Sequence, residues 1–231
     1  MRTDAAYCFK YILDFAADLG KGEIVKICGA LIRVANDRFP QELKIQIYYA
    51  LRFIQLKGGP SAKGFQVNMQ TTYTKALGDP QSTAPSRRIV IENLLLLVQS
   101  LPRIDPIVKD LNALIDGTKI DGDQKMSASE CLALIIRLKG KAISSAISQT
   151  IYKTMTDVLS ELDGSTNDRI FCNCASALAF LSAYASDASQ MQALFNAFDE
   201  NAVDAIMLPL KFAILINGND TIDKSELVAA F

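Results

Sequence analysis

The chain has 231 residues, of which 50% are hydrophobic, and its formal net charge is −1. Histidine is absent, which excludes Ser-His-Asp triads, Cys-His pairs and histidine-ligated metals. The near-zero charge argues against a general nucleic-acid binder, and no uninterrupted apolar run reaches the length of about 18 residues that a membrane span needs.

Apolar residues recur at helical spacing along nearly the whole chain. In 41–57, for example, Leu43, Ile47 and Ile54 fall on one face. No stretch alternates with period two between hairpin turns, so no strand is predicted. In chain order, the predicted helices are 3–18, 23–35, 41–57, 61–77, 85–101, 105–115, 123–139, 142–162, 166–185, 188–198, 201–217 and 222–230.

The breaks between helices also repeat. An Asp follows a helix end at intervals of 36 to 47 residues, at Asp37, Asp79, Asp116, Asp163 and Asp199. Its carboxylate can cap the next helix or bond its own turn. This period is typical of HEAT and armadillo arrays, in which helix pairs stack because one pair cannot bury its own apolar face. We therefore predict an all-α, HEAT/armadillo-like α-solenoid of about six helix pairs that winds as a right-handed superhelix.

The predicted solenoid forms a single domain over 1–231. The repeat boundaries are expected near 1–36, 37–78, 79–115, 116–162, 163–198 and 199–231. The chain ends at Phe231 without the polar cap that the terminal repeat of a free-standing array requires. We therefore expect a fragment of a longer array.

The five cysteines lie on apolar helix patterns and are Cys8, Cys28, Cys131, Cys172 and Cys174. We interpret them as small buried hydrophobes in a reducing compartment, with a redox role as the alternative.

Metal and cofactor chemistry is not indicated. The segment "ILINGNDTIDKSEL" resembles half of a calcium loop, but it lacks the acidic first ligand and the glycine at the sharp turn. Asp121 and Asp123 lie at the start of a predicted helix, and the N-terminus of a helix favours carboxylates. No nucleophile has a base and no phosphate-binding loop is present, so we expect no enzyme, no cofactor and no metal.

Charge is distributed unevenly. Residues 1–115 hold 15 Lys and Arg against 10 Asp and Glu, whereas 116–231 hold 9 against 15. This asymmetry reflects either drift between repeats or an N-terminal half that faces an acidic partner. Arg87 and Arg88 could hold an acidic group, although a solvated helix start is the simpler interpretation.

The corner at 36–40, "NDRFP", separates two apolar helix patterns. Arg33 lies one turn before the predicted helix end, where a cation is favoured by the helix dipole. Arg38 lies in the loop beside Phe39 and Pro40, and loop arginines of solenoids suit bidentate binding of partner carboxylates. Composition alone favours a structural role for this corner and leaves a binding role open.

Three motifs carry a resemblance to a known family. They are "KICGALIRVANDRFPQELKIQIYYAL", "FQVNMQTTYTKALGD" and "LPRIDPIVKDLNALIDG". At this spacing they resemble the C-terminal part of the Gcn-one general-control family, very large cytosolic HEAT-repeat proteins, most strongly over about 20–120. The matching positions are Leu31, Ile32, Arg33, Asp37, Arg38 and Phe39, then Gln70, Thr72, Tyr73, Lys75, Ala76, Leu77 and Asp79, then Arg103, Asp105 and Pro106.

The resemblance implies a function. Proteins of this family bind stalled ribosomes in amino-acid starvation and activate the Gcn-two kinase, which phosphorylates the alpha subunit of initiation factor two. Their C-terminal HEAT region binds the RWD domain of that kinase. The family's binding arginine falls on Arg33 and an aromatic of the next repeat on Phe65, and we expect Asp37 and Arg38 to brace the corner. The implied location is the cytoplasm.

The resemblance also implies partners. We expect the RWD domain to bind this segment, the ribosome to be bound through other parts of the full-length protein, and neither nucleic acid nor membrane to be bound directly. The alternatives are a generic HEAT scaffold of transport or cytoskeletal type, a helical enzyme, and a module that binds ribosomal RNA through a basic stripe with steep salt dependence.

Overall fold

The computed structural model describes residues 20–117, 122–161 and 169–185. Within these ranges the chain forms nine α-helices, one short 3-10 turn and no strand. The helices are α2 (Lys21–Asn36), α3 (Gln41–Lys57), α4 (Gly59–Lys63), α5 (Gln66–Leu77), α6 (Ala84–Ser100), α7 (Asp105–Asp116), α8 (Gly122–Lys139), α9 (Ser145–Glu161) and α10 (Arg169–Ala185). The helices predicted at 3–18, 188–198, 201–217 and 222–230 lie outside the described residues.

The predicted helices agree with the structure except at 61–77. That segment forms two helices, α4 and α5, separated by Gly64 and Phe65. The amide of Phe65 donates to the carbonyl of Ala62 at 3.0 Å, so a tight turn interrupts the helical bonding here. A glycine at the break lowers the helical propensity, but the apolar pattern continues through it.

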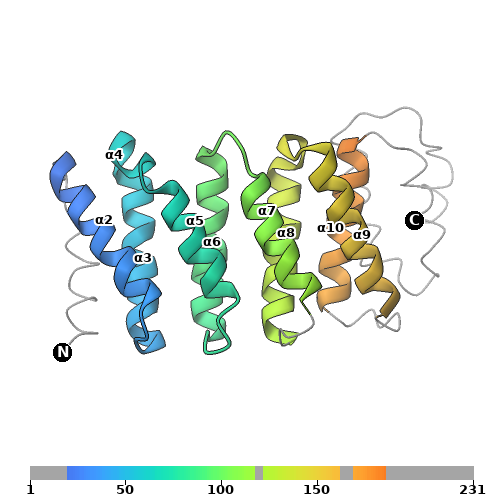
Figure 1. Cartoon of the computed structure of the whole chain (residues 1–231), viewed down its shortest axis with the longest axis horizontal. Helices are drawn as coiled ribbons and strands as arrows, with labels where there is room; N and C mark the ends of the chain where they lie inside the picture. The colour runs from blue at the N-terminus through green and yellow to red at the C-terminus, as the bar shows by residue number, and fades with distance from the viewer. Residues whose placement is uncertain (1–19, 118–121, 162–168, 186–231) are drawn as a thin grey trace, which may run out of the picture. The chain divides into compact units, whose positions relative to one another are not determined.

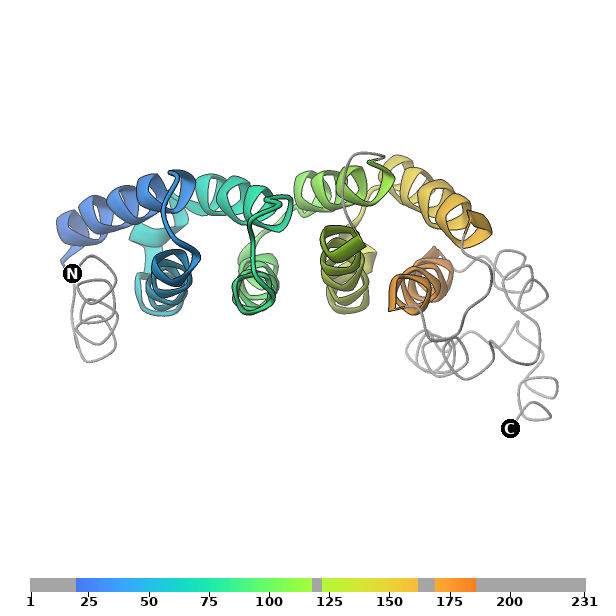
Figure 2. The same cartoon turned by 90° about the horizontal axis from the view of Figure 1, so that it is seen from below.

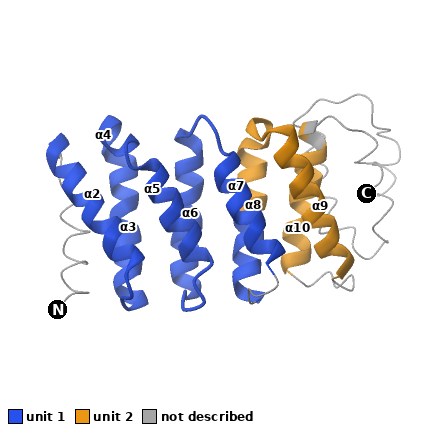
Figure 3. Ribbon diagram, viewed as in Figure 1, with its two compact units in different colours: residues 1–131 blue, residues 132–231 orange. Residues whose placement is uncertain are grey.

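The chain divides into two compact units, residues 1–131 and 132–231, with the boundary inside α8 (Figure 3). The expectation of one continuous solenoid segment therefore stays a prediction.

In the first unit the helices form two layers. Figures 1 and 2 show α2, α5 and α7 in one layer and α3 and α6 in the other. Helix α2 packs against α3 and α5, while α6 packs against α3 and α5. Fully buried side chains fill the seam between the layers, among them Cys28, Leu51, Met69, Leu77 and Leu94. This stacking of helix pairs confirms the all-α solenoid prediction for the described part of the unit.

The predicted repeat boundary of 37–78 groups α3 with α5. In the structure α3 packs against both α2 and α6. Asp37 lies in the α2–α3 turn and Asp79 in the α5–α6 turn. The repeat boundaries therefore stay a prediction.

In the second unit α9 packs against α10, which also contacts the 3-10 turn η1 (Gly140–Ala142). The Tyr184 hydroxyl donates to the Arg137 carbonyl at 2.8 Å and links α10 to the end of α8. Gly140 lies so close to the Tyr184 ring that an added Cβ would be 2.4 Å from it. None of the helices in the described ranges combines the length and apolarity needed to cross a membrane.

Candidate functional site

The corner between α2 and α3 begins where α2 ends at Asn36. Asp37 has an extended backbone, and its amide donates to the Val34 carbonyl at 3.2 Å. The carbonyl of Pro40 accepts the amides of Leu43 and Lys44 and so starts α3. Proline has no backbone N–H to donate, so Pro40 cannot extend α2. The chain changes direction here, and α3 begins at the next residue.

Three of the four predicted site residues lie at this corner. Arg33, in the last turn of α2, and the loop residues Asp37 and Arg38 are all exposed. Within the described part of the chain, none of their charged groups makes a hydrogen bond or an ion pair. The corner therefore presents two guanidinium groups and one carboxylate to solvent.

Bracing of the corner comes from Asn36, which the sequence reasoning missed. Its amide nitrogen donates to the Ile32 carbonyl at 2.8 Å and to the Thr72 hydroxyl at 3.0 Å. The latter bond joins α2 to α5. The expectation that Asp37 and Arg38 brace the corner is therefore wrong for the described residues, because their side chains point to water and the bracing group is a neutral amide. No local signal identifies Asn36, since its partner is 36 residues away.

Phe65 lies apart from this corner. It precedes the first residue of α5 and is half-buried, and its carbonyl accepts the amide of Met69 at 2.8 Å. Thr72, which meets Asn36, follows Phe65 by seven residues, or about 10 Å along α5. The structure thus groups Arg33, Asp37 and Arg38 and separates Phe65 from them.

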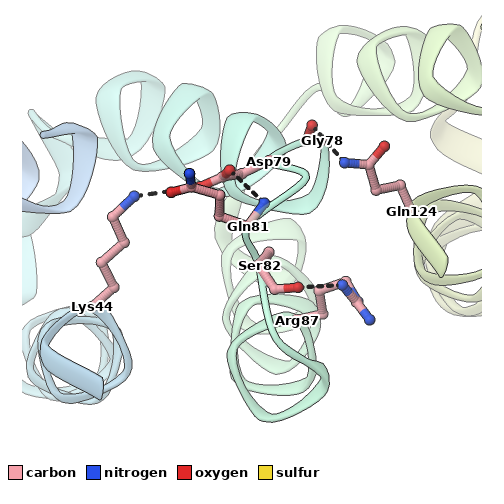
Figure 4. Close-up of polar contacts among 7 residues, drawn as sticks. All are labelled: Lys44, Gly78, Asp79, Gln81, Ser82, Arg87 and Gln124. Carbon is pink, nitrogen blue, oxygen red and sulfur yellow. Dashed lines mark hydrogen bonds and ion pairs between the residues drawn. The ribbon is translucent and has the colours of Figure 1, made fainter. Parts of the chain in front are cut away.

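In the turn between α5 and α6, unlike at the α2–α3 corner, the charged groups are paired within the chain (Figure 4). Asp79 accepts the amide of Gln81 at 2.9 Å, which confirms that this Asp bonds its own turn. Its second carboxylate oxygen lies 3.4 Å from the ammonium nitrogen of Lys44, which extends from the preceding α3. Gln124 of α8 donates to the Gly78 carbonyl at 3.1 Å.

Arg87 belongs to the same network. It donates to the Ser82 carbonyl and, at 2.8 Å, to the carboxylate of Asp123. Only 7% of Arg87 is exposed, so the interpretation as a solvated helix start is wrong for this residue. Arg88 does extend into solvent, with a 3.5 Å contact to Glu92. Lys44 and Arg87 are thus used within the fold, in contrast to Arg33 and Arg38.

No disulfide joins any two of the described cysteines. Cys28, Cys131 and Cys174 are fully buried, as predicted, while Cys172 is half-buried. Burial raises the pKa of the Cys28 thiol to about 12 and raises that of Cys131 as well, which disfavours the reactive thiolate. Cys8, Asp121 and the calcium-loop-like segment lie outside the described residues. In the ranges that the structure covers, no group of three potential ligands could hold a metal ion.

Comparison with known proteins gives the following relatives. The chain is 28% identical over 197 residues to Protein ILITYHIA of Arabidopsis thaliana, covering 85% of this chain and 7% of that protein. It is 28% identical over 172 residues to the stalled ribosome sensor GCN1 of Mus musculus, covering 74% of this chain and 6% of the relative. It is 30% identical over 109 residues to the eIF-2-alpha kinase activator GCN1 of Saccharomyces cerevisiae, covering 47% of this chain and 4% of that protein.

The chain therefore spans only 4 to 7% of the length of these curated relatives. No protein-family model matches it, and no solved structure matches it. The similarity to the first two of these relatives nevertheless extends over 85% and 74% of the chain. By sequence, the chain is similar to short segments of these GCN1 proteins.

Proposed function

We propose that this chain is a non-enzymatic, protein-binding segment of a GCN1-like translational regulator. It binds the RWD domain of the Gcn-two kinase and helps to couple stalled ribosomes to kinase activation in the cytoplasm. The ribosome is bound through other parts of the full-length protein. Two relatives support this proposal through their names, a stalled ribosome sensor and an eIF-2-alpha kinase activator. Those names do not favour a transport or cytoskeletal scaffold.

The observation that carries the proposal is the state of Arg33. It is exposed, it makes no hydrogen bond or ion pair with the described residues, and it occupies the "LIR" motif of the resemblance. A free guanidinium can form two parallel hydrogen bonds with a partner carboxylate. Lys44 and Arg87, by contrast, have carboxylate partners within the chain.

In this proposal Arg33 is the ionic contact, and Asp37 and Arg38 flank it. Phe65 is a separate apolar contact, since it lies about 10 Å along α5 from the residue that Asn36 touches. An arginine at the centre of an interface typically contributes about 2 kcal/mol or more, which is roughly a thirtyfold change in Kd. An exposed, unpaired arginine contributes little to folding, within about 0.5 kcal/mol.

The test is a binding titration of the whole chain against the RWD domain of the kinase from the same source. We expect Arg33→Ala to raise Kd about thirtyfold while its thermal melt stays unchanged. Arg103→Ala is the matched control, because Arg103 is also exposed and makes no side-chain bond with the described residues. Its Kd should equal that of the unmodified chain.

Three results would contradict the proposal. The first is an unmodified chain that does not bind the RWD domain. The second is an equal loss of binding in both variants, which would indicate a general charge effect. The third is a lowered Tm of Arg33→Ala, which would show that Arg33 supports the helix end.

A further inference from the structure

A second candidate site is a cavity in the first unit, away from the α2–α3 corner. It has a volume of about 470 Å³ and opens where the last turns of α3 and α6 meet α4 and the first turns of α5. Ligand pockets commonly enclose about 300–1,000 Å³. Arg33, Asp37, Arg38 and Phe65 do not line it.

The short helix α4 forms one wall of the cavity, and two glycines allow it to do so. Gly59 has a φ of +51°, a conformation that residues with a Cβ rarely adopt. A Cβ on Gly58 would lie 2.5 Å from the carbonyl oxygen of Ile54. The next equivalent connection, 101–104 between α6 and α7, contains no helix. The wall that α4 provides is therefore absent from the α6–α7 connection.

The floor of the cavity is apolar. Met69 and Leu97 lie on it and are 0% and 2% exposed. Leu56 stands beside them with 57% exposure, one of the few large hydrophobic side chains that the described surface presents to water. An apolar side chain placed against Leu56 would remove this surface from water, which is favourable by the hydrophobic effect.

The polar groups of the wall are neutral amides and a hydroxyl. Gln66 is already paired, because its amide donates to the Ser100 hydroxyl at 2.9 Å. Gln55 is not: neither its nitrogen nor its oxygen has a partner among the described residues, although both atoms are shielded from solvent. A carboxamide donates and accepts at once, so its complement is a peptide group with one N–H and one C=O.

The single charged side chain of the cavity lining favours one kind of peptide. Lys63 is exposed and is the sole ionisable side chain among the residues that line the cavity. The C-terminal ends of α3 and α6 and the N-terminal ends of α4 and α5 all line the cavity, so their opposite partial charges offset one another. The apolar floor disfavours a buried anion. A carboxylate is therefore complementary to the rim beside Lys63 and not to the floor.

We propose that this cavity binds a short peptide segment of a partner protein in which a bulky apolar side chain adjoins an acidic residue. The apolar side chain lies on Met69 and Leu97 next to Leu56. On binding, the Gln55 side chain turns into the cavity and its carboxamide pairs with the peptide main chain, while the acidic side chain meets Lys63. The site is separate from the corner proposed to bind the kinase.

The experiment titrates the whole chain, labelled on its methionine methyl groups, with two probe peptides by NMR. The first is acetyl-Glu-Phe-Leu-Glu-amide, and the second replaces each Glu by Lys. Met69→Leu identifies the Met69 signal. We expect the acidic peptide to shift that signal saturably and to bind about tenfold more tightly than the basic one, a difference of about 1.4 kcal/mol.

Variants separate this site from general charge effects. Lys63→Glu should raise the Kd of the acidic peptide about tenfold. The matched control is Lys26→Glu, at an exposed lysine of α2, and it should leave that Kd unchanged. Gln55→Met should weaken both peptides while the fold is kept. Arg33→Ala should bind the acidic peptide normally, which keeps this proposal distinguishable from the kinase proposal. The proposal is overturned if no saturable shift occurs, if both peptides bind equally, or if Lys63→Glu behaves as Lys26→Glu does.

Discussion

Replacing Asp79 separates the two interactions that hold the turn between α5 and α6. One carboxylate oxygen accepts the amide of Gln81, and the other lies 3.4 Å from the ammonium nitrogen of Lys44. Asp79→Asn keeps an acceptor for the Gln81 amide and removes the charge. Asp79→Ala removes both interactions. The loss of stability in Asp79→Asn therefore reports the ion pair, and the further loss in Asp79→Ala reports the turn hydrogen bond.

The magnitude follows from the burial of the pair. The side chains of Lys44 and Asp79 are 11% and 28% exposed, so the pair is neither a surface salt bridge nor fully buried. Exposed pairs contribute about 0.2–1 kcal/mol, and removing one partner of a fully buried pair costs about 3–5 kcal/mol. We expect Asp79→Asn to lower the free energy of unfolding by about 2 kcal/mol and Asp79→Ala by about 3, the difference being one turn hydrogen bond.

The assay is urea unfolding of the single variants, of Lys44→Met and of the double variant Lys44→Met/Asp79→Asn. Lys44→Met removes the cation that Asp79→Asn leaves without a partner. The double variant should therefore be more stable than the sum of the single losses predicts, by about 1–2 kcal/mol. In a thermal melt, Asp79→Asn should lower Tm by about 4–8 °C for a chain of this size. Additive losses in the double variant would refute the reasoning, because they would show no energetic coupling between Lys44 and Asp79.

Two further predictions concern α2. Asn36→Ala and Thr72→Val should each lower the free energy of unfolding, measured in urea, by about 1 kcal/mol, because each removes the hydrogen bond between Asn36 of α2 and Thr72 of α5. An unchanged urea midpoint in either variant would contradict the role assigned to Asn36. Burial raises the pKa of the Cys28 thiol from 9.0 to about 12, so the unfolded state loses this proton first as the pH rises. The free energy of unfolding should therefore fall as the pH rises above about 9. The slope of this fall should be smaller in Cys28→Ala than in the unmodified chain, by up to about 1.4 kcal/mol per pH unit. Equal slopes in urea unfolding would count against a buried, protonated thiol.

The helices were predictable because local signals define them. The predicted bounds of 41–57 coincide with α3, where an apolar stripe lies between Pro40 and Gly58. The break at Gly64 and Phe65 was missed because α4 and α5 together keep the apolar spacing of one helix. Periodicity reports which face is apolar and is insensitive to a short turn that preserves that face.

The grouping of the helices into repeats stays a prediction. Asp at 37 and 79 identified the recurring turns correctly, but a recurring turn can lie inside a pair or between pairs. Helix α3 packs against both α2 and α6, so helix packing does not make this choice. Sequence spacing carries no information on it, because both assignments have the same period.

The candidate site was predictable only in part. The corner, its motif and the cation in the last turn of α2 were visible in the sequence. The charges of Arg33 and Arg87 look alike in the sequence, yet Arg33 faces solvent and Arg87 is buried against Ser82 and Asp123. The difference depends on which side chains of other helices come within reach.

By itself, the amino-acid sequence determined the all-α class, nearly all described helix bounds, the turn role of Asp79 and the similarity to GCN1 proteins, because each rests on local spacing or on motif identity. The tertiary structure alone decided which helices contact one another, the Asn36–Thr72 link, the free state of Arg33 and the cavity beside α4. Each of these depends on contacts between residues that are distant in the chain, and those contacts exist only once the apolar faces of the helices have stacked.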